Sequence, residues 1–169
     1  MNAPSRVELR AAEPRDHSAI AVLGVESFAR FGDYRRSMSQ WLGNPGIATF
    51  LAEQDGVMQG FAMIALLQTE AAPEACVLAV CVQSSAQGRG VGRLLLGHAL
   101  ERLGREGAEH GATEVFADVA DDNTAALALF GGVGFLDRGP SGATYPGGQA
   151  ARRLTRPLPH SDSDTIRPC

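Results

Sequence analysis

The sequence contains no lysine, since all 15 of its basic residues are arginines. The absence excludes every chemistry that needs a lysine side chain, including a Schiff base, a pyridoxal-phosphate anchor and the phosphate-binding lysine of a Walker A loop. The accompanying richness in arginine, alanine and glycine is typical of a GC-rich genome and does not indicate a function.

Cysteine is scarce as well. Cys76, Cys81 and Cys169 are odd in number and have no paired metal-ligand spacing, so no metal site is expected. No apolar run approaches the length of a membrane span, and the first residues lack the hydrophobic stretch of a signal peptide. These absences predict a cytoplasmic protein in a reducing environment, with no membrane contact.

The residues that are present predict one globular domain. The chain has 169 residues, of which 44% are hydrophobic and 20% charged, which is enough to bury an ordinary core. Its net charge of −4 argues against a nucleic-acid partner, because modules that follow phosphates are usually basic. We assign residues 1–156 to the domain and residues 157–169 to a polar C-terminal tail.

Hydrophobic periodicity predicts strands and helices that form an α/β domain with a mixed sheet. Strands are expected near residues 7–11, 49–53, 57–67, 76–82, 113–119, 135–138 and 150–156. Helices are expected after Asp16 to about residue 28, around 38–42, at 91–106 and at 123–133. Gly104 and Gly107 are expected to end the third helix, and Gly134 the fourth.

A glycine-rich segment follows the buried strand predicted at 76–82. Its sequence at 87–92, Gln-Gly-Arg-Gly-Val-Gly, opens a helix. A Walker A loop is excluded by the missing lysine, and a dinucleotide-binding GxGxxG pattern fails because Arg93 stands at the third glycine position. An anion site fits, because a helix N-terminus carries about half a positive charge and Gly90 and Gly92 allow a close approach. A plain turn before a helix explains the glycines equally well.

Two stretches resemble motifs of the GNAT superfamily of N-acetyltransferases, in the same order. Residues 80–96 resemble its acetyl-CoA-binding motif, which is a strand, a polar bend, Gln-x-x-Gly-x-Gly and a helix. Residues 118–135 resemble its block of carboxylate, loop, asparagine, helix, tyrosine and Gly-Phe, most closely in the ribosomal-protein N-terminal acetyltransferase-like branch. The resemblance implies an α/β (α+β) GNAT fold, with a mixed, mostly antiparallel central sheet flanked by about four helices.

The resemblance implies a site for acetyl-CoA as co-substrate. The residues that it assigns to the cofactor are Val80, Cys81, Val82, Gln87, Gly88, Arg89, Gly90, Val91, Gly92, Arg93, Asn123 and Phe130. The backbone at 80–82 would hydrogen-bond the pantetheine and the thioester carbonyl, and residues 88–93 would wrap the pyrophosphate. Asn123 would contact the pantetheine arm, which is compatible with the helix N-cap position that asparagine also favours.

The resemblance also assigns Asp118 the position of a carboxylate proposed as general base in related enzymes. Acyl transfer needs a neutral amine, so some group must take the proton of the alkylammonium, directly or through water. The other interpretation of Asp118 is a solvent-facing strand carboxylate. Phe130 departs from the pattern, because many relatives carry a tyrosine there that can protonate the departing thiol. Tyr145 is either a substitute donor or a loop anchor.

The variable remainder of the chain predicts the acceptor pocket. We expect it between residues 28–41, which include Tyr34, and the loop at 70–74, with Trp41 either in the pocket or in the core. Cys81 lies beside the expected thioester, and we expect it to pack as a small hydrophobe rather than to carry an acyl group.

The function that the resemblance implies is direct transfer of an acetyl group from acetyl-CoA to a primary amine, without a metal. The acceptor is either a protein N-terminus or a small-molecule amine. The alternative is a non-catalytic acyl-CoA-binding domain, which Phe130 favours because it cannot donate a proton. A homodimer stays open, since dimers are common in families of this kind.

Overall fold

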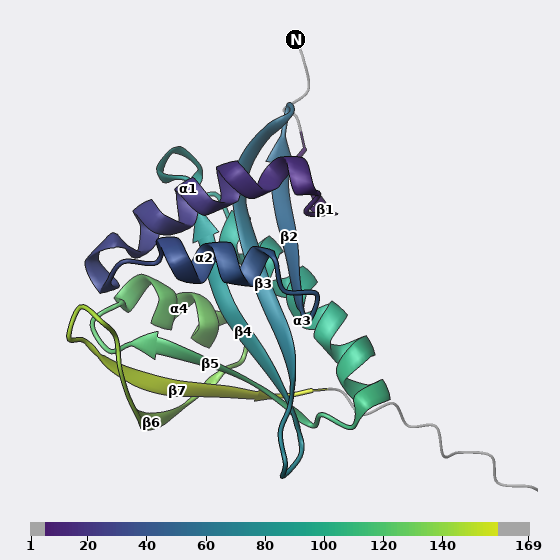
Figure 1. Ribbon diagram of the computed structural model, residues 1–169, viewed down its shortest axis with the longest axis vertical. Helices are drawn as coiled ribbons and strands as arrows, with labels where there is room; N and C mark the ends of the chain where they lie inside the picture. The colour runs from purple at the N-terminus through teal and green to yellow at the C-terminus, as the bar shows by residue number, and fades with distance from the viewer. Residues whose placement is uncertain (1–5, 159–169) are drawn as a thin grey trace, which may run out of the picture.

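The computed structural model describes residues 6–158, which form one seven-stranded sheet with helices on both faces (Figure 1). The strands are β1 (Glu8–Ala11), β2 (Ile47–Gln54), β3 (Val57–Gln68), β4 (Pro73–Val82), β5 (Glu114–Ala120), β6 (Leu136–Thr144) and β7 (Ala150–Pro157). Their order is β1-β2-β3-β4-β5-β7-β6, and β4–β5 is the parallel pair in this otherwise antiparallel sheet. The prediction of a mixed, mostly antiparallel sheet is confirmed.

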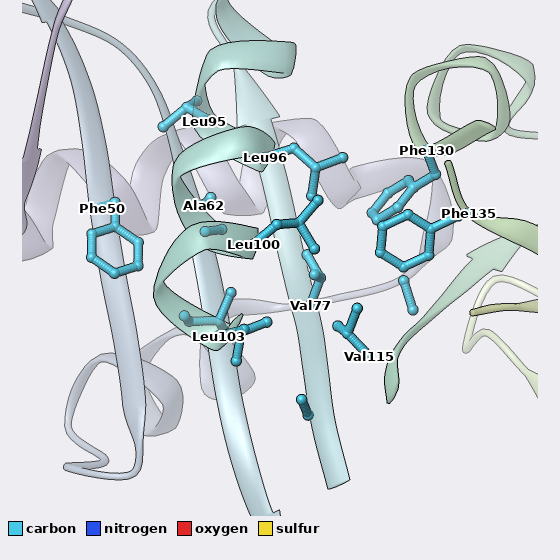
Figure 2. Close-up of a cluster of buried hydrophobic side chains, with 14 of the residues drawn as sticks. Phe50, Ala62, Val77, Leu95, Leu96, Leu100, Leu103, Val115, Phe130 and Phe135 are labelled. Carbon is cyan, nitrogen blue, oxygen red and sulfur yellow. The ribbon is translucent and has the colours of Figure 1, made fainter. Parts of the chain in front are cut away.

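The helices are α1 (His17–Phe28), α2 (Arg35–Leu42), α3 (Val91–His110) and α4 (Thr124–Gly132), with short 3-10 turns η1 (Pro14–Asp16), η2 (Ala29–Phe31) and η3 (Ser84–Ala86). Alternation along the strands sends successive side chains to opposite faces of the sheet. On one face Phe61 and Met63 pack against α1 and α2. On the other face Ala62 and Ile64 pack against α3, in the cluster that Figure 2 draws.

The parallel strands β4 and β5 are joined over a short distance and then diverge. They pair at Ala75–Val115 and at Cys76–Phe116, after which β4 continues to Val82 with no strand on that edge within the described sheet (Figure 1). Beyond this point, the backbone N–H and C=O groups on that edge of β4 have no strand partner and can form hydrogen bonds with a ligand or with water.

A β-bulge in β4 accounts for the divergence. Met63 pairs with Ala79 whereas the next residue, Ile64, pairs with Val77, so Leu78 is an extra residue in β4. Leu78 and Ala79 accordingly pack against the same apolar cluster although they are adjacent. Because a bulge bends the strand that carries it, β4 turns away from β5 directly after their last shared pair.

Three boundaries differ from those predicted. Helix α3 runs through Gly104 and Gly107 to His110, because both glycines are buried and a side chain at Gly107 would meet Leu158 at 2.8 Å. Strand β6 extends to Thr144, well beyond the predicted residue 138. Pro157 ends β7 and Leu158 is buried, so the tail begins later than residue 157. The rest of the predicted tail, residues 159–169, lies outside the described residues.

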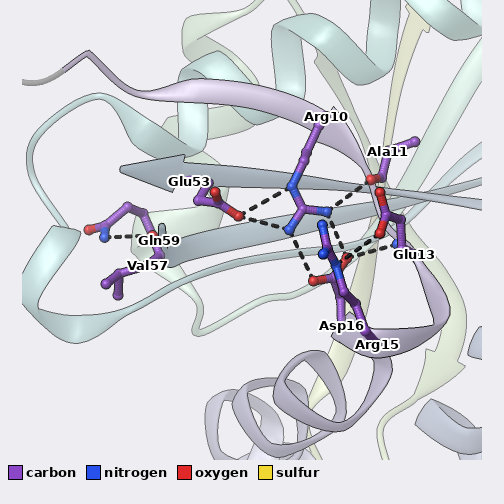
Figure 3. A network of polar contacts seen from close by, with 8 residues as sticks. All are labelled: Arg10, Ala11, Glu13, Arg15, Asp16, Glu53, Val57 and Gln59. Atoms are coloured by element: carbon purple, nitrogen blue, oxygen red, sulfur yellow. Dashed lines mark hydrogen bonds and ion pairs between the residues drawn. The ribbon is translucent and has the colours of Figure 1, made fainter. Parts of the chain in front are cut away.

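An arginine at the start of the chain ties three elements together. Arg10 in β1 donates to Asp16 Oδ2 at 2.7 Å and to Glu53 Oε2 at 2.8 Å (Figure 3). Asp16 ends η1 and precedes α1, whereas Glu53 lies in β2. The hydrogen bonds from Arg10 are the largest cause that lowers the pKa of Asp16 to about 2. The network therefore fixes the entry of α1 against the sheet.

Replacing Arg10 with leucine is expected to lower the free energy of unfolding by about 1–3 kcal/mol, because two carboxylates lose a charged donor. Arg15→Leu is the control, since Arg15 pairs with Glu13 where both side chains are mostly exposed, and such pairs contribute about 0–1 kcal/mol. Stability from Asp16 is present above its ordinary pKa and should decline as the pH falls towards 2. Equal urea midpoints for the two variants would contradict this account.

Candidate active site

A cleft of about 530 Å³ lies where β4 and β5 separate. Four segments enclose it. They are the end of β4, the glycine-rich loop with the first turn of α3, the N-terminal part of α4, and the end of α1 with η2. The lining residues are Ser27, Phe28, Phe31, Val80, Cys81, Val82, Ala86, Gln87, Gly88, Gly90, Val91, Gly92, Arg93, Asn123, Ala125, Ala126 and Leu129.

The glycine-rich loop presents open backbone to this cleft. Gly88 and Gly90 have φ of 74° and 81°, the left-handed region in which glycine is unstrained. A side chain built on either residue would meet no atom within 4 Å. The first helical bond of α3 runs from Leu94 N–H to Gly90 O at 3.0 Å, so the N–H groups of residues 91–93 precede it and are free for a ligand. The segment therefore has the geometry of a cradle for an anion at a helix N-terminus.

Three other residues of the segment have more specific positions. Gln87 donates from Nε2 to the carbonyl of Val82 at 3.1 Å, which ties the loop to the end of β4. Arg93 lines the cleft and reaches over Gly132 at the end of α4. Arg89 is exposed and does not line the cleft. A side chain at Gly92 would contact Leu129, so this glycine sets the spacing between α3 and α4.

Asn123 caps a helix and borders the cleft. Its Oδ1 accepts from Ala126 N–H at 3.2 Å and so caps α4, and the residue lines the cleft as well. The cap fixes the direction in which α4 starts, which aims Ala126 and Leu129 into the cleft.

A second cavity, of about 240 Å³, shares Phe28 with the cleft. Its walls are mainly aromatic and apolar and it contains one carboxylate. The lining residues are Phe28, Tyr34, Trp41, Leu78, Asp118, Ala143, Thr144, Tyr145, Pro146 and Ala151. Phe28, Tyr34 and Trp41 come from the range 28–41 in which the acceptor pocket was expected. The loop at 70–74 does not contribute, because it connects β3 and β4 at the far end of the sheet (Figure 1).

The loop between β6 and β7, and not the loop at 70–74, forms this wall of the second cavity, because it packs against η2. Gln149 donates from Nε2 to the carbonyl of Arg30 at 2.9 Å, and Gly147 N–H donates to the carbonyl of Phe31 at 2.7 Å. Arg30 in turn pairs with Asp122 at 3.2 Å, at the start of the β5–α4 turn. These contacts link the end of α1, the β6–β7 loop and the β5–α4 turn around the second cavity.

Tyr145 anchors that loop. Its ring lies 5.3 Å from the ring of Phe31, and its hydroxyl donates to the carbonyl of Asp118 at 2.8 Å. Burial raises the pKa of Tyr145 to about 12, so the hydroxyl stays protonated near neutral pH. Its proton is engaged with a backbone carbonyl, which favours the loop anchor over the substitute donor.

Asp118 forms a bidentate ion pair with its cross-strand neighbour, Arg153. Nε and Nη2 of Arg153 donate to the two carboxylate oxygens at 2.6 and 2.9 Å. The guanidinium also lies over the ring of Phe116, 4.1 Å from its centroid. The pair with Asp118 raises the pKa of Arg153, so the arginine remains charged. The sequence predicted the carboxylate but not its partner.

The family model described as the acetyltransferase (GNAT) family matches residues 9–135 of this chain. The chain belongs to this family. The match includes the glycine-rich loop, Asp118 and Asn123, and it confirms the prediction of an acyltransferase of the GNAT type.

Known acetyltransferases resemble this chain in part of the sequence and in the overall fold. L-2,4-diaminobutyric acid acetyltransferase of Nocardia farcinica is 36% identical over 89 residues, which are 53% of this chain and 43% of that protein. The aligned part thus spans less than half of the relative. The ribosomal-protein-S18-alanine N-acetyltransferase of Escherichia coli superposes with a TM-score of 0.71 at 20% identity, over 96% of this chain and 100% of its own.

A protein from Salmonella typhimurium, solved with its cofactor acetyl-CoA, superposes with a TM-score of 0.70 at 20% identity, over 94% of this chain and 98% of its own. At these identities the two superpositions show the GNAT fold, which confirms the fold predicted from the sequence.

Within this GNAT fold, Phe130 does not occupy the place expected for it. It is 5% exposed and belongs to the apolar core, where its ring meets Phe135 edge-on at 4.9 Å (Figure 2). Leu129 and Ala126, one and four positions earlier, line the cleft instead. Helical spacing fixes which face each residue takes, and the sequence motif alone does not reveal which face borders the cleft.

Phe130→Tyr is expected to lower the free energy of unfolding by about 1–3 kcal/mol without raising turnover, because the added hydroxyl enters an apolar core. Phe116→Tyr is the control, since its ring is partly exposed on the other face of the sheet. Chemical unfolding and initial rates measure both effects. A faster Phe130→Tyr variant of unchanged stability would place this ring at the departing thiol.

Cys81 lines the cleft but has the properties of a core residue. It is 3% exposed, and burial is the main cause that raises its pKa to about 12. A thiol with this pKa carries almost no thiolate near neutral pH, and the thiolate is the nucleophilic form. The expected packing function therefore fits better than a covalent acyl carrier.

The described residues contain no group of three or more histidine, cysteine, aspartate or glutamate side chains arranged to hold a metal ion. Between residues 6 and 158, no helix is long and apolar enough to cross a membrane.

Proposed function

We propose that this chain binds acetyl-CoA in the cleft and transfers its acetyl group directly to a primary amine held in the second cavity. The observation that carries the proposal is the open backbone at Gly88 and Gly90, which lines a cleft that also includes Val80–Val82 and shares Phe28 with the aromatic cavity. Members of the acetyltransferase (GNAT) family use acetyl-CoA, and the backbone N–H groups at the start of α3 together with Arg93 complement the negative charge of its pyrophosphate.

Different chemical groups along the cleft would bind different parts of the cofactor. The N–H groups at the start of α3 and the guanidinium of Arg93 would bind the pyrophosphate. The free edge of β4 at Val80–Val82 would hydrogen-bond the pantetheine amides, as a strand would. Asn123 and Leu129 would line the opposite wall. Acetyl-CoA supplies the acetyl group as a thioester and leaves as the thiol.

The acceptor loses two protons overall. One leaves the alkylammonium before attack, and we assign it to Asp118, directly or through water. The other leaves the nitrogen when the new N–C bond replaces the C–S bond, and it ends on the sulfur. Phe130 has no hydroxyl to protonate the departing sulfur, and a thiol with a pKa of about 8.5 leaves well enough as a thiolate to take up this proton afterwards.

We further propose that the acceptor is a small molecule rather than a protein N-terminus. The β6–β7 loop is bonded to η2 through Gln149 and Gly147, so a chain leaving the cavity on that side would have to break these contacts. A volume of about 240 Å³ also lies below the usual range of about 300–1,000 Å³ for drug-sized ligands. The motif resemblance to ribosomal-protein acetyltransferases therefore concerns the cofactor half, and the homodimer remains an expectation.

The alternative, a non-catalytic acyl-CoA-binding domain, is favoured by the buried Phe130 and by the engagement of Asp118 with Arg153. Release of free CoA thiol from acetyl-CoA, measured across a panel of amines and amino acids, separates the two functions. An enzyme gives thiol in equal amount to an acetylated acceptor identified by mass. Tight acetyl-CoA binding with no acceptor-dependent thiol release would establish the binding domain instead.

A further inference from the structure

The ion pair between Asp118 and Arg153 lies at the edge of the acceptor cavity and is accessible. The two residues are register partners in β5 and β7, and their side chains are 30% and 38% exposed. Ala151, two residues before Arg153 on the same face of β7, lines the cavity together with Asp118. A molecule in the cavity therefore meets the carboxylate of Asp118, and the guanidinium of Arg153, which is not itself a lining residue, is bonded to that carboxylate.

The guanidinium keeps unused donors. Nε and Nη2 of Arg153 bond to Asp118, and among the described residues Nη1 has no hydrogen-bond partner. Stacking on Phe116 at 4.1 Å fixes the plane of the group, so its free edge has a defined direction. Arginine binds carboxylates in this planar manner more strongly than it binds neutral acceptors.

The same pair limits what Asp118 can do in the free protein. Both of its oxygens accept from Arg153, at 2.6 and 2.9 Å. A simple alkylammonium would have to compete with Arg153 for these oxygens and would leave the guanidinium without its partner. An acceptor that brings its own carboxylate would replace that partner at no loss of ion pairing.

We propose that the acceptor is a small α-amino acid with an apolar side chain, whose carboxylate binds Arg153 and whose ammonium binds Asp118. The proposal rests on the acetyl-transfer function proposed above. The aromatic walls formed by Phe28, Tyr34 and Trp41 receive the side chain. With the carboxylate on Arg153 and the ammonium on Asp118, both members of the ion pair keep a charged partner.

Matched pairs of acceptors test the proposal, because each pair differs by the carboxylate alone. The pairs are L-leucine with 3-methylbutylamine and L-phenylalanine with 2-phenylethylamine. We expect kcat/KM to be at least about 100-fold higher for the amino acid of each pair, since a charge-assisted bidentate contact is lost with the amine.

Arg153→Met keeps a long side chain over Phe116 and removes every donor, and Arg153→Gln is a second variant in case the first folds poorly. Either variant should reduce the preference for the amino acid to less than about tenfold, through a loss of kcat/KM for the amino acid. Arg152→Met is the matched control. Arg152 is the adjacent residue of β7 and pairs with Asp137 at 2.6 Å, so its loss should leave the preference intact.

Equal rates for amino acid and amine in the wild type would overturn the inference and leave the acetyltransferase function standing. A preference that survives in Arg153→Met and Arg153→Gln would overturn it as well, because the carboxylate would then bind elsewhere. Absence of turnover with all amino acids and amines, although acetyl-CoA binds, would overturn the proposed function and the inference with it.

Discussion

Asp118→Asn is expected to lower the rate constant of acetyl transfer by about 10²- to 10⁴-fold, which is the usual contribution of a general base. Asparagine keeps the shape of the side chain but cannot accept the ammonium proton. Affinity for acetyl-CoA should persist, because Asp118 lines the acceptor cavity and not the cleft. The loss should shrink as the pH rises, since a larger share of the amine is then already neutral.

Asp122→Asn is the matched control for this experiment. Asp122 lies in the turn after β5, pairs with Arg30 in a largely exposed contact, and lines neither cavity. Its loss should change turnover by no more than about twofold, because exposed pairs contribute little. If both variants turned over at the same rate at neutral pH, Asp118 would be a strand carboxylate that holds Arg153. Solvent would then carry the proton.

Gly90→Asp is expected to weaken acetyl-CoA binding by about 30- to 1,000-fold. The new carboxylate would enter the open cradle beside the anionic pyrophosphate, and two like charges about 4 Å apart near a protein surface repel by about 2–4 kcal/mol. A clash with the protein is not expected, because a side chain at Gly90 meets no atom within 4 Å. Calorimetric titration with acetyl-CoA measures the effect directly.

Gly90→Asn separates charge from shape. Asparagine matches aspartate in size and tolerates the same left-handed conformation, which Gly90 adopts with φ of 81°. The difference in affinity between the two variants is therefore electrostatic, and it should decrease at high salt. Equal affinities, both close to that of the unchanged protein, would mean that the anion binds elsewhere.

The sequence predicted which helices and strands form better than it predicted the residues at which they end. Strand alternation and helical spacing are local properties, so the strands and the main helices could be predicted from them. The end of α3 was predicted too early, because Gly104 and Gly107 lower helix propensity locally. Packing against Leu158 overrides that cost, and it depends on residues more than 50 positions away. The bulge at Leu78 left no signal in a continuously apolar strand.

Most of the residues predicted around the glycine-rich loop line one cleft, whereas the lining of the second cavity was largely not predicted. The glycine-rich loop and Asn123 act through their own backbone and neighbouring residues, so a short motif reveals them. The β6–β7 loop and Arg153 join the site through contacts with Arg30, Phe31 and Asp118 that are distant in sequence. Phe130 was predicted at the thiol because the motif gives its position but not the direction of its side chain.

A structure of the protein with bound CoA tests the central claim most directly, namely that the divergence of β4 and β5 forms a cofactor cleft opening into the acceptor cavity. The account predicts the pyrophosphate over Gly88–Arg93 at the start of α3, and the thiol between Val80 and Phe28, where the two cavities meet. CoA bound outside the cleft, or with its thiol directed away from the cavity that holds Asp118, would contradict it.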